Sequence, residues 1–267
     1  MTTAANCQTL LQLSDLHILA DADATLIGVN TRHYFNQVLE LAFAEQGSVD
    51  SVLLTGDLAQ DPVASSYRYI ADTLRDYAVQ CLCLPGNHDD YPLMQQTLTT
   101  ENISCNKQTV LANWQIICLN SQIIGSEGGE LAAEELNFLE SCLQDQPDLY
   151  ALVAVHHHCL ATDSVWMDTM QIANSETFLA LIARYPQTKL IVHGHIHQEM
   201  DTTVNGVRVL GTPSTCFQFK PRSQHFAVDD APPAYRVIRL YPDGRVDSEV
   251  SRLHERIAEL QADTEGY

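Results

Sequence analysis

The sequence predicts a layered α/β fold, because short apolar runs alternate with segments of helical periodicity along most of its length. Hydrophobic residues make up 45% of the 267 residues and charged residues 18%, a balance typical of globular proteins. No internal repeat, linker or low-complexity segment interrupts the pattern. We therefore expect a single domain over residues 1–267, with a β-rich C-terminal part at about 202–250.

The first half of the chain predicts three strands and two helices. Strands are expected at 9–13, 51–54 and 81–84. A helix is expected at about 31–46, ended by Gly47, with one buried face made of Phe35, Val38, Leu39 and Ala42. Asp61-Pro62 predicts the start of the second helix, with the carboxylate as cap and proline in the first turn. Its buried side would hold Tyr67, Ile70, Leu74 and Ala78.

The second half continues the alternation and then becomes richer in strands. The expected strands lie at 115–119, 151–155 and 189–192, and the expected helices at about 131–143 and 175–184. Asn205-Gly206 predicts a hairpin between 202–204 and 207–209, and Pro242-Asp243-Gly244 marks another turn. A last helix is expected at 248–261.

The net charge of the chain argues against some classes of binding partner. Lys and Arg total 14 against 34 Asp and Glu, a formal net charge of −20. This excess of acid argues against a nucleic-acid backbone and against an anionic membrane surface as partners. No apolar stretch approaches the roughly 18 residues of a membrane span, and no basic segment followed by an apolar run opens the chain. We therefore expect a cytoplasmic protein.

The cysteines fit a reducing compartment. There are eight, none in a Cys-x-x-Cys pair, so we expect most of them to be reduced and buried. Cys81, Cys83 and Cys118 lie in apolar runs, where a thiol serves as a small hydrophobic group.

Five of the apolar runs end in potential metal ligands. These are Asp15 and His17, then Asp57, then Asn87 and His88, then the triplet His156-His157-His158, and finally His195 and His197. A single Asp after a strand is usually a turn or cap residue, and a lone His is usually structural. Five such sites at five strand ends are hard to assign to chance together. Because neighbouring strands bring their carboxyl ends to one edge of a sheet, we expect these groups to meet there.

The residue types indicate the chemistry of this cluster. Imidazole, carboxylate and one carboxamide suit Mn, Fe, Zn or Co, and the set is too large for one tetrahedral zinc ion. Two ions are therefore expected, and Asp57 is the natural bridging ligand because its loop lies between the others. Two divalent cations outweigh the charge of two carboxylates and a hydroxide, so this pocket would attract a phosphate anion.

These motifs resemble those of the calcineurin-like metallophosphoesterase superfamily in order and spacing. The resemblance rests on Asp15-Leu16-His17, Gly56-Asp57, Gly86-Asn87-His88-Asp89, the histidine triplet and Gly194-His195-Ile196-His197, and so spans residues 15–197. It implies a two-sheet αββα sandwich flanked by helices, with a dinuclear metal centre.

The resemblance also implies residue roles. One ion would be held by Asp15, His17, Asp57 and His197, and the other by Asp57, Asn87, His157 and His195. His88 would donate a hydrogen bond to the phosphate or protonate the leaving oxygen, which makes His88 and Asp57 the implied catalytic residues. The implied substrate-binding residues are His17, Asp57, Asn87, His88 and His197.

The histidine triplet leaves its ligand open between neighbours. Members of the superfamily often have the ligand two positions before a proline, which favours His157, but Cys159 stands at the proline position here. In an extended strand His156 and His158 would face away from His157. For His193, packing or support of the site is preferred over metal binding.

Further segments resemble bacterial class III cyclic AMP phosphodiesterases. They are Thr212-Pro213-Ser214-Thr215-Cys216, Gln218-Phe219-Lys220-Pro221, Pro232-Pro233-Ala234-Tyr235-Arg236 leading into a strand, and Pro242-Asp243-Gly244. This resemblance extends to about Arg245 and implies hydrolysis of 3′,5′-cyclic AMP to 5′-AMP by a metal-bridging hydroxide. The expected cofactors are two divalent ions per chain, Fe or Mn first and Zn or Co as alternatives, in a monomer or homodimer.

Two other functions stay open at this point. The metal ligands describe the phosphate and not its substituents, so a phosphomonoesterase or a diesterase of broader specificity fits them too. A non-catalytic scaffold on the same fold would be expected to lose ligands, and here every motif is filled.

Overall fold

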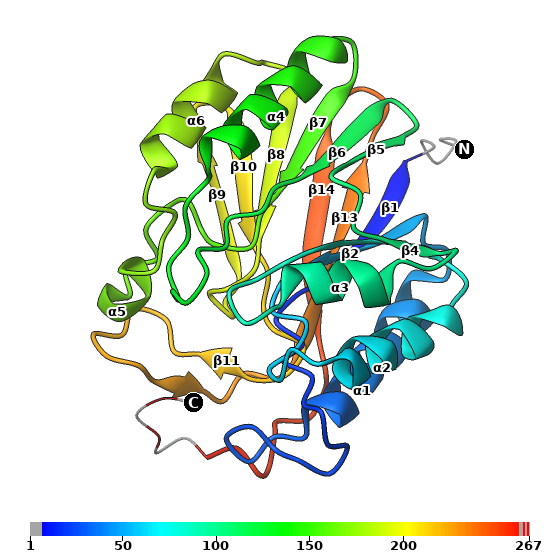
Figure 1. The fold of residues 1–267 in the computed structure, drawn as a ribbon, viewed down its shortest axis with the longest axis vertical. Helices are drawn as coiled ribbons and strands as arrows, with labels where there is room; N and C mark the ends of the chain where they lie inside the picture. Colours follow the sequence, from blue (N-terminus) through cyan, green and yellow to red (C-terminus); the bar gives the residue numbers. More distant parts are fainter. Residues whose placement is uncertain (1–6, 262–263, 265, 267) are drawn as a thin grey trace.

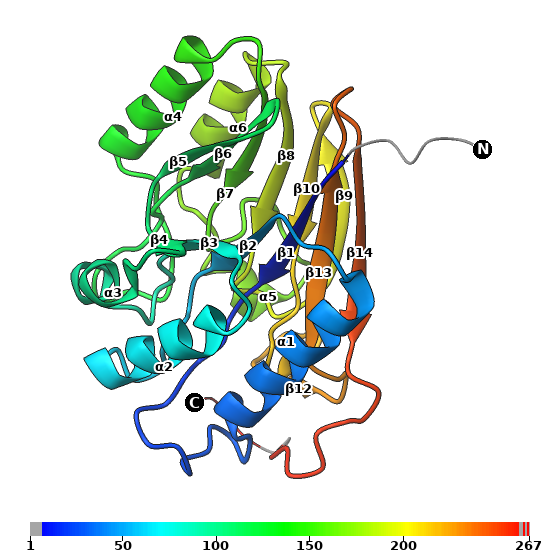
Figure 2. The same ribbon diagram turned by 90° about the vertical axis from the view of Figure 1, so that its right-hand side faces the viewer.

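Two six-stranded sheets lie face to face in the computed structural model, which describes residues 7–261, 264 and 266. Figure 1 shows helices on the outer side of both sheets, and Figure 2 shows the same layers after a turn of 90°. The expected αββα sandwich is therefore confirmed. None of the helices in the described part of the chain combines the length and apolarity needed to cross a bilayer.

The first sheet contains the strands that carry three of the ligand motifs. Its order is β14 (Val246–Arg252), β13 (Ala234–Leu240), β1 (Gln8–Leu13), β2 (Ser51–Thr55), β3 (Gln80–Leu84) and β4 (Ile103–Ser104). Strands β1 to β4 are parallel, whereas β13 pairs antiparallel with both β1 and β14. The carboxyl ends of β1, β2 and β3 consequently lie side by side.

The second sheet carries the other two motifs. Its order is β5 (Gln108–Leu111), β6 (Trp114–Cys118), β7 (Tyr150–Ala154), β8 (Thr188–His193), β10 (Val207–Gly211) and β9 (Met200–Val204). Strands β6, β7, β8 and β10 are parallel, and β9 and β10 form the expected hairpin around Asn205-Gly206. A short ladder of β11 (Gln218–Phe219) and β12 (Val228–Asp229) stands apart from both sheets.

The helices divide between the outer faces of the two sheets. Residues of α1 (Thr31–Gln46), α2 (Ala64–Arg75) and α3 (Tyr91–Leu98) share an apolar core with the first sheet. Residues of α4 (Ala133–Asp145) and α6 (Ser175–Ala183) share another with the second sheet. The short helix α5 (Val165–Asp168) belongs to neither layer and follows the loop after β7.

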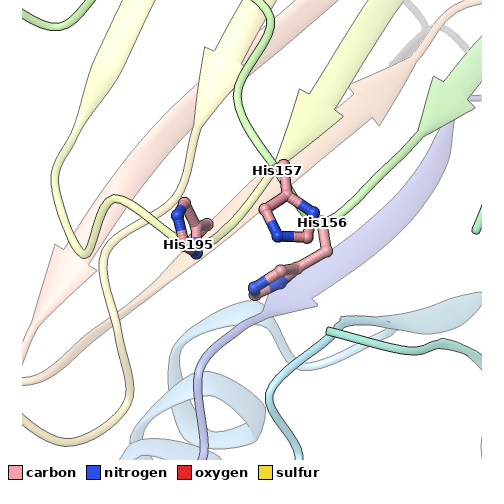
Figure 3. Close-up of side chains that lie close together, drawn as sticks. All are labelled: His156, His157 and His195. Carbon is pink, nitrogen blue, oxygen red and sulfur yellow. The ribbon is translucent and has the colours of Figure 1, made fainter. Parts of the chain in front are cut away.

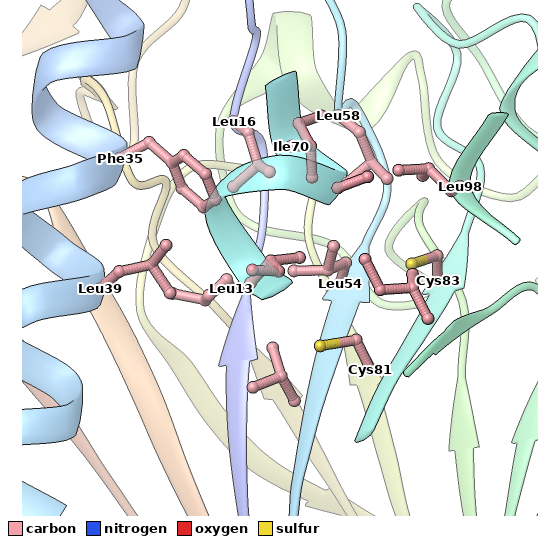
Figure 4. Packing of buried hydrophobic residues seen from close by; sticks show 14 of the residues in the cluster. Leu13, Leu16, Phe35, Leu39, Leu54, Leu58, Ile70, Cys81, Cys83 and Leu98 are labelled. Carbon is pink, nitrogen blue, oxygen red and sulfur yellow. The ribbon is translucent and has the colours of Figure 1, made fainter. Parts of the chain in front are cut away.

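Strand alternation explains how one strand serves two cores. In β1, Leu11 and Leu13 face the helices, whereas Leu10 faces the opposite sheet. Figure 4 shows Leu13, Leu54 and Cys83 of neighbouring strands packed under the helical side chains. All eight cysteines are free, and six of them, Cys81 and Cys83 included, are buried.

Helix α1 has the bounds that the sequence predicts. Asn30 accepts a hydrogen bond from the backbone N–H of His33 at its start, and Gly47 ends it with a φ of 64°. The expected face of Phe35, Val38, Leu39 and Ala42 is buried.

The predicted start of the second helix is wrong. Helix α2 begins at Ala64, Val63 precedes it without a side-chain cap, and the Asp61 carboxylate instead accepts a hydrogen bond from the N–H of Ala20. Ala78 is exposed and lies beyond the helix, which ends at Arg75. The Asp61 carboxylate is taken by the loop after β1, so it is not available as a cap.

The predicted helix at 248–261 is also wrong. Strand β14 occupies Val246–Arg252 and pairs with β13 along its whole length, and residues 253–261 are irregular. The edge of β13 offers unpaired backbone groups to this segment, and that tertiary pairing outweighs its local helical preference. The elements α3, α5, β4, β5 and the β11–β12 ladder were not predicted, although Asp90 and Pro92 mark the start of α3 as a cap and a first-turn proline.

The buried guanidinium of Arg236 joins the two sheets near the β13–β14 edge of the first sheet. Arg236 of β13 is 1% exposed and donates hydrogen bonds to the Gly211 carbonyl of β10 and to the Thr212 hydroxyl. It also reaches the Met200 carbonyl of β9 and the Ser248 hydroxyl of β14. Burial lowers the pKa of Arg236 to about 10, so the guanidinium remains charged at neutral pH.

Candidate metal centre

The five ligand motifs meet where the carboxyl ends of the two sheets converge. Two hydrogen bonds join the sheets at this point: His156 Nδ1 lies 2.8 Å from the Thr55 carbonyl oxygen, and Gln12 Nε2 donates to the His193 carbonyl over 3.2 Å. Potential ligand atoms form four overlapping groups, each within 4.8 Å: Asp15, His17 and His197; His17, Asp57 and His88; Asp15, Asp57 and His156; and His156, His157 and His195. All the residues expected at the site, Asn87 included through its contact with His156, are brought together.

Two imidazoles at the centre, those of His17 and His197, face each other with their Nε2 atoms. His17 Nδ1 lies 2.8 Å from Gln60 Oε1, and His197 Nδ1 lies 2.8 Å from the Phe217 carbonyl oxygen. These contacts turn the two Nε2 atoms toward each other, and they lie 3.2 Å apart. Together with the Asp15 carboxylate they form one of the groups that could hold a metal ion.

The carboxylates complete this half of the site. Asp15 is fully buried, accepts hydrogen bonds of 3.1 Å from the His195 N–H to both oxygens, and has Oδ1 3.4 Å from His197 Nε2. Burial lowers the pKa of His17 to about 3, which keeps it neutral as a ligand must be.

Asp57 lies between the two halves. Its Oδ2 is 3.9 Å from His17 Nε2 and 3.3 Å from His156 Nε2, and its Oδ1 accepts a hydrogen bond from the His88 N–H over 2.9 Å. Burial would raise the pKa of Asp57, but the neighbouring His156 lowers it well below its usual range. This position suits the bridging role expected of it.

His156 is oriented differently from the expectation. Strand β7 ends at Ala154, so the alternation of an extended strand does not continue through the triplet. Figure 3 shows that His156 and His157 both turn toward His195. His156 Nε2 contacts Asn87 Oδ1 at 3.1 Å as well as Asp57. Burial opposes protonation, yet the Asp57 carboxylate raises the pKa of His156 to about 9.

His157 and His195 form the other half of the site. Their ring centroids are 4.7 Å apart, and burial lowers the pKa of both well below the usual value. His157 Nδ1 lies 2.7 Å from the Ser121 hydroxyl, while its Nε2 lies 3.2 Å from the Glu127 carbonyl oxygen. His195 Nε2 is buried without a hydrogen-bond partner among the described residues, which suits a ligand atom.

Two further buried histidines, His158 and His193, lie beside the site and do not join the ligand groups. His158 packs against His195 with stacked rings and lies 3.6 Å from Asp168 Oδ1. His193 holds its Nδ1 2.9 Å from the Gly194 carbonyl and is fully buried. The packing role preferred for His193 agrees with this placement.

The backbone at the ligands is strained. Asp15, His17, Asp57, His195 and His197 have φ angles between 46° and 66°, in the left-handed region that few non-glycine residues adopt. Each such residue costs about 1–3 kcal/mol, and the cost is typical of functional sites.

Glycines allow the loops to approach one another closely. A Cβ at Gly86 would collide with the backbone and carboxylate of Asp57, and one at Gly194 would collide with the Ser14 hydroxyl. Only glycine therefore permits the loop after β3 to approach that after β2, and the loop after β8 to approach that after β1, at this distance.

Asp89 is a buried carboxylate that links several loops, a role that the sequence motif containing it did not indicate. It is 5% exposed and accepts hydrogen bonds from the N–H groups of Leu58, Ala59 and Gly86 and from the Tyr67 hydroxyl. The loops that carry Asp57 and Asn87 are thus held by one carboxylate. Burial and the nearby Asp57 raise the pKa of Asp89 to about 6.

A cavity of about 490 Å³ opens over the centre. Its floor contains Asp57, Asn87, His88 and His195, and its walls are largely apolar. His88 is half-buried there, with its ring centroid 5.1 Å from that of His17. The volume lies in the range of pockets that bind small molecules.

The sequence is similar to a known family and to known proteins. A family model described as calcineurin-like phosphoesterase matches residues 9–199. A protein of Vibrio vulnificus named 3′,5′-cyclic adenosine monophosphate phosphodiesterase CpdA is 39% identical over 94% of this chain and 92% of its own length. The protein of the same name in Escherichia coli K12 is 38% identical over 97% and 94%. A protein of Nostoc named 3′,5′-cyclic-nucleotide phosphodiesterase is 36% identical over 92% of both chains.

Solved structures share the fold at low sequence identity. A dimetal phosphatase from Danio rerio has a TM-score of 0.60 at 14% identity, covering 92% of this chain and 98% of its own. GAP50, described as the anchor in the inner membrane complex of Plasmodium, has a TM-score of 0.65 at 12% identity, covering 97% and 90%.

Substitution of Asp89 tests whether its carboxylate holds together the loops that carry Asp57 and Asn87. We expect Asp89→Ala to lower the free energy of unfolding by about 3 kcal/mol or more, because four buried donors lose their acceptor. Metal affinity should fall with it. Chemical denaturation and metal titration of the purified protein measure both effects.

Asp90→Ala is the matched control. Asp90 is exposed and caps α3 by accepting from the Leu93 N–H, so its loss should cost about 1 kcal/mol and leave metal affinity unchanged. Equal effects of the two substitutions would contradict the role of Asp89.

Proposed function

The chain belongs to the calcineurin-like phosphoesterase family, and we propose that it hydrolyses 3′,5′-cyclic AMP to 5′-AMP at the centre described above. The observation that carries the proposal is the pair of facing His17 and His197 Nε2 atoms beside two buried carboxylates, under an open cavity. The substrate follows from relatives that are named cyclic AMP phosphodiesterases and align over more than nine-tenths of both chains.

The donor set suits two divalent ions. We assign one to Asp15, His17, Asp57 and His197, and the other to Asp57, Asn87, His157 and His195. When bound, such ions would neutralise the phosphate oxygens and supply the hydroxide that attacks phosphorus. Imidazole, carboxylate and carboxamide ligands favour Fe or Mn and also admit Zn or Co.

The residues of the chain then hold the carboxylates in place and supply a proton to the departing oxygen. The buried carboxylates Asp15 and Asp57 are fixed by the backbone N–H groups of His195 and His88. During hydrolysis a bond forms from the attacking oxygen to phosphorus, and the bond from phosphorus to the 3′ oxygen breaks. His88, on the floor of the cavity, would give its proton to the departing 3′ oxygen.

A substrate panel tests the function. The protein loaded with Mn or Fe should convert 3′,5′-cyclic AMP to 5′-AMP and stop there, because the cyclic diester and not the monoester is the proposed substrate. Chromatography of the products checks this, with 5′-AMP and a generic aryl diester assayed alongside. Faster hydrolysis of 5′-AMP would identify a phosphomonoesterase, and faster hydrolysis of the aryl diester a broader diesterase.

The role of His88 has its own prediction. His88→Ala should lower kcat for cyclic AMP by about 10²–10⁴-fold while the protein keeps its metal content, because a proton donor is lost and no ligand is. Elemental analysis and steady-state kinetics measure the two quantities. His33→Ala, an exposed histidine of α1, is the control. Loss of metal from His88→Ala would make His88 a ligand.

The ligand within the triplet is decided by metal content. We expect His157→Ala to lose about one ion per chain, because His157 faces the orphaned His195 nitrogen and is oriented by Ser121. His156→Ala should keep both ions, since the Asp57 carboxylate 3.3 Å from its Nε2 raises the pKa of His156 to about 9, and a ligand imidazole must be neutral. The reverse result would move the ligand to His156.

A further inference from the structure

Three aromatic side chains from distant parts of the chain form one wall of the cavity. They are Trp166 of α5, Phe219 of β11 and Phe226, which lies between β11 and β12; we call them the aromatic wall. The three rings meet edge to face, with centroids 5.1 Å apart for Trp166 and Phe219, 5.3 Å for Trp166 and Phe226, and 5.5 Å for the two phenylalanines. Such contacts hold the rings in a defined arrangement.

The aromatic wall is joined directly to the metal centre. The ring of Phe219 stacks on that of His197, with centroids 4.1 Å apart and an angle of 19° between planes. The same cavity is lined by His88 and Asn87 on its floor and by Trp166 and Phe226 on its wall. A molecule whose phosphate lies on the floor therefore has its remaining part beside the aromatic rings.

Trp166 is held rigidly while its ring stays within reach of the cavity. The indole Nε1 donates to the Ser223 hydroxyl over 2.9 Å, so the polar atom of the ring is satisfied. The backbone N–H of Val165 donates to the Ser223 carbonyl, and the Thr169 hydroxyl donates to the Trp166 carbonyl. The side chain is half-buried and keeps part of its surface open. An oriented ring loses little entropy when a flat ligand stacks on it.

The chemistry of the lining favours a flat apolar group. Met167 and Met170 stand beside the rings, and Glu127 and Thr169 are the polar residues of the lining outside the floor. No Lys or Arg lines this cavity among the described residues. The wall thus offers stacking and dispersion contacts, and anion recognition is left to the floor. Purine bases stack on such aromatic faces.

We propose that Trp166, supported by Phe226, is the nucleobase subsite of this enzyme and fixes its preference for nucleotides over phosphodiesters without a base. The inference rests on the proposed function, since it assigns the base of the same substrate. It adds a specificity-determining surface to the phosphate chemistry of the floor.

Tryptophan fluorescence tests the subsite without turnover. The chain has two tryptophans, and Trp114 is fully buried in the core between the sheets, where its Nε1 donates to the Tyr241 carbonyl. Of the two tryptophans, Trp166 is therefore the one whose fluorescence a bound base can change. Titration of the metal-loaded protein with 5′-AMP should quench its emission, whereas inorganic phosphate should not. Equal responses to the two probes would contradict the subsite.

Kinetics of substituted proteins provide the second readout. Trp166→Ala should raise KM for cyclic AMP and Ki for 5′-AMP about 5- to 100-fold, with kcat, metal content and Ki for inorganic phosphate close to those of the unaltered protein. Trp166→Phe should recover part of the affinity because it restores a ring. Val165→Ala is the matched control, since its neighbouring side chain is 59% exposed and does not line the cavity.

The outcomes separate the two proposals. Quenching by 5′-AMP without hydrolysis of cyclic AMP would contradict the proposed function and support the base subsite. Hydrolysis of cyclic AMP with an unchanged KM in Trp166→Ala would contradict the subsite and leave the function standing. A change in Ki for inorganic phosphate equal to that for 5′-AMP would show damage to the floor and would also contradict the subsite.

Discussion

The gathering of His17 and His197 beside the buried carboxylates of Asp15 and Asp57 is the constraint on which the rest of the site depends. Their Nε2 atoms are 3.2 Å apart, and each ring is fixed by a hydrogen bond on its other nitrogen. The buried carboxylates of Asp15 and Asp57 need positive charge nearby. The contacts on the Nδ1 atoms orient both imidazoles so that their Nε2 atoms point to the place where a cation would supply that charge.

The sandwich brings these side chains together because the carboxyl ends of strands from both sheets meet at the same place. Gln12 and His156 join the strand ends of opposite sheets through hydrogen bonds, and Asp89 holds together two of the loops that carry ligands. At the edge of the sandwich Arg236 links β13 to β10. Polar contacts of buried side chains therefore fix how the sheets meet, while the apolar layers keep them packed.

The sequence predicted the features that local patterns determine. Helix α1 carries its own cap residue and its own ending glycine, so its bounds could be read directly. The ligand motifs could be placed at strand ends because the strands are apolar and parallel. The segment after Ser248 misled the prediction, because its strand exists only through pairing with β13. The aromatic wall was equally hidden, since residues 166, 219 and 226 have no common periodicity and meet only in the folded chain.

The proposed ligands that have left-handed backbone angles have a consequence for how such a protein can change over generations. At Asp15, His17, Asp57, His195 and His197 the residue that suits a metal site is not the residue that the backbone prefers. A drift to glycine at any of them relieves the main chain by about 1–3 kcal/mol while it removes a proposed ligand. Descendants that no longer need catalysis can therefore shed it and gain robustness in the same step, so purifying selection must act continually to keep the centre intact.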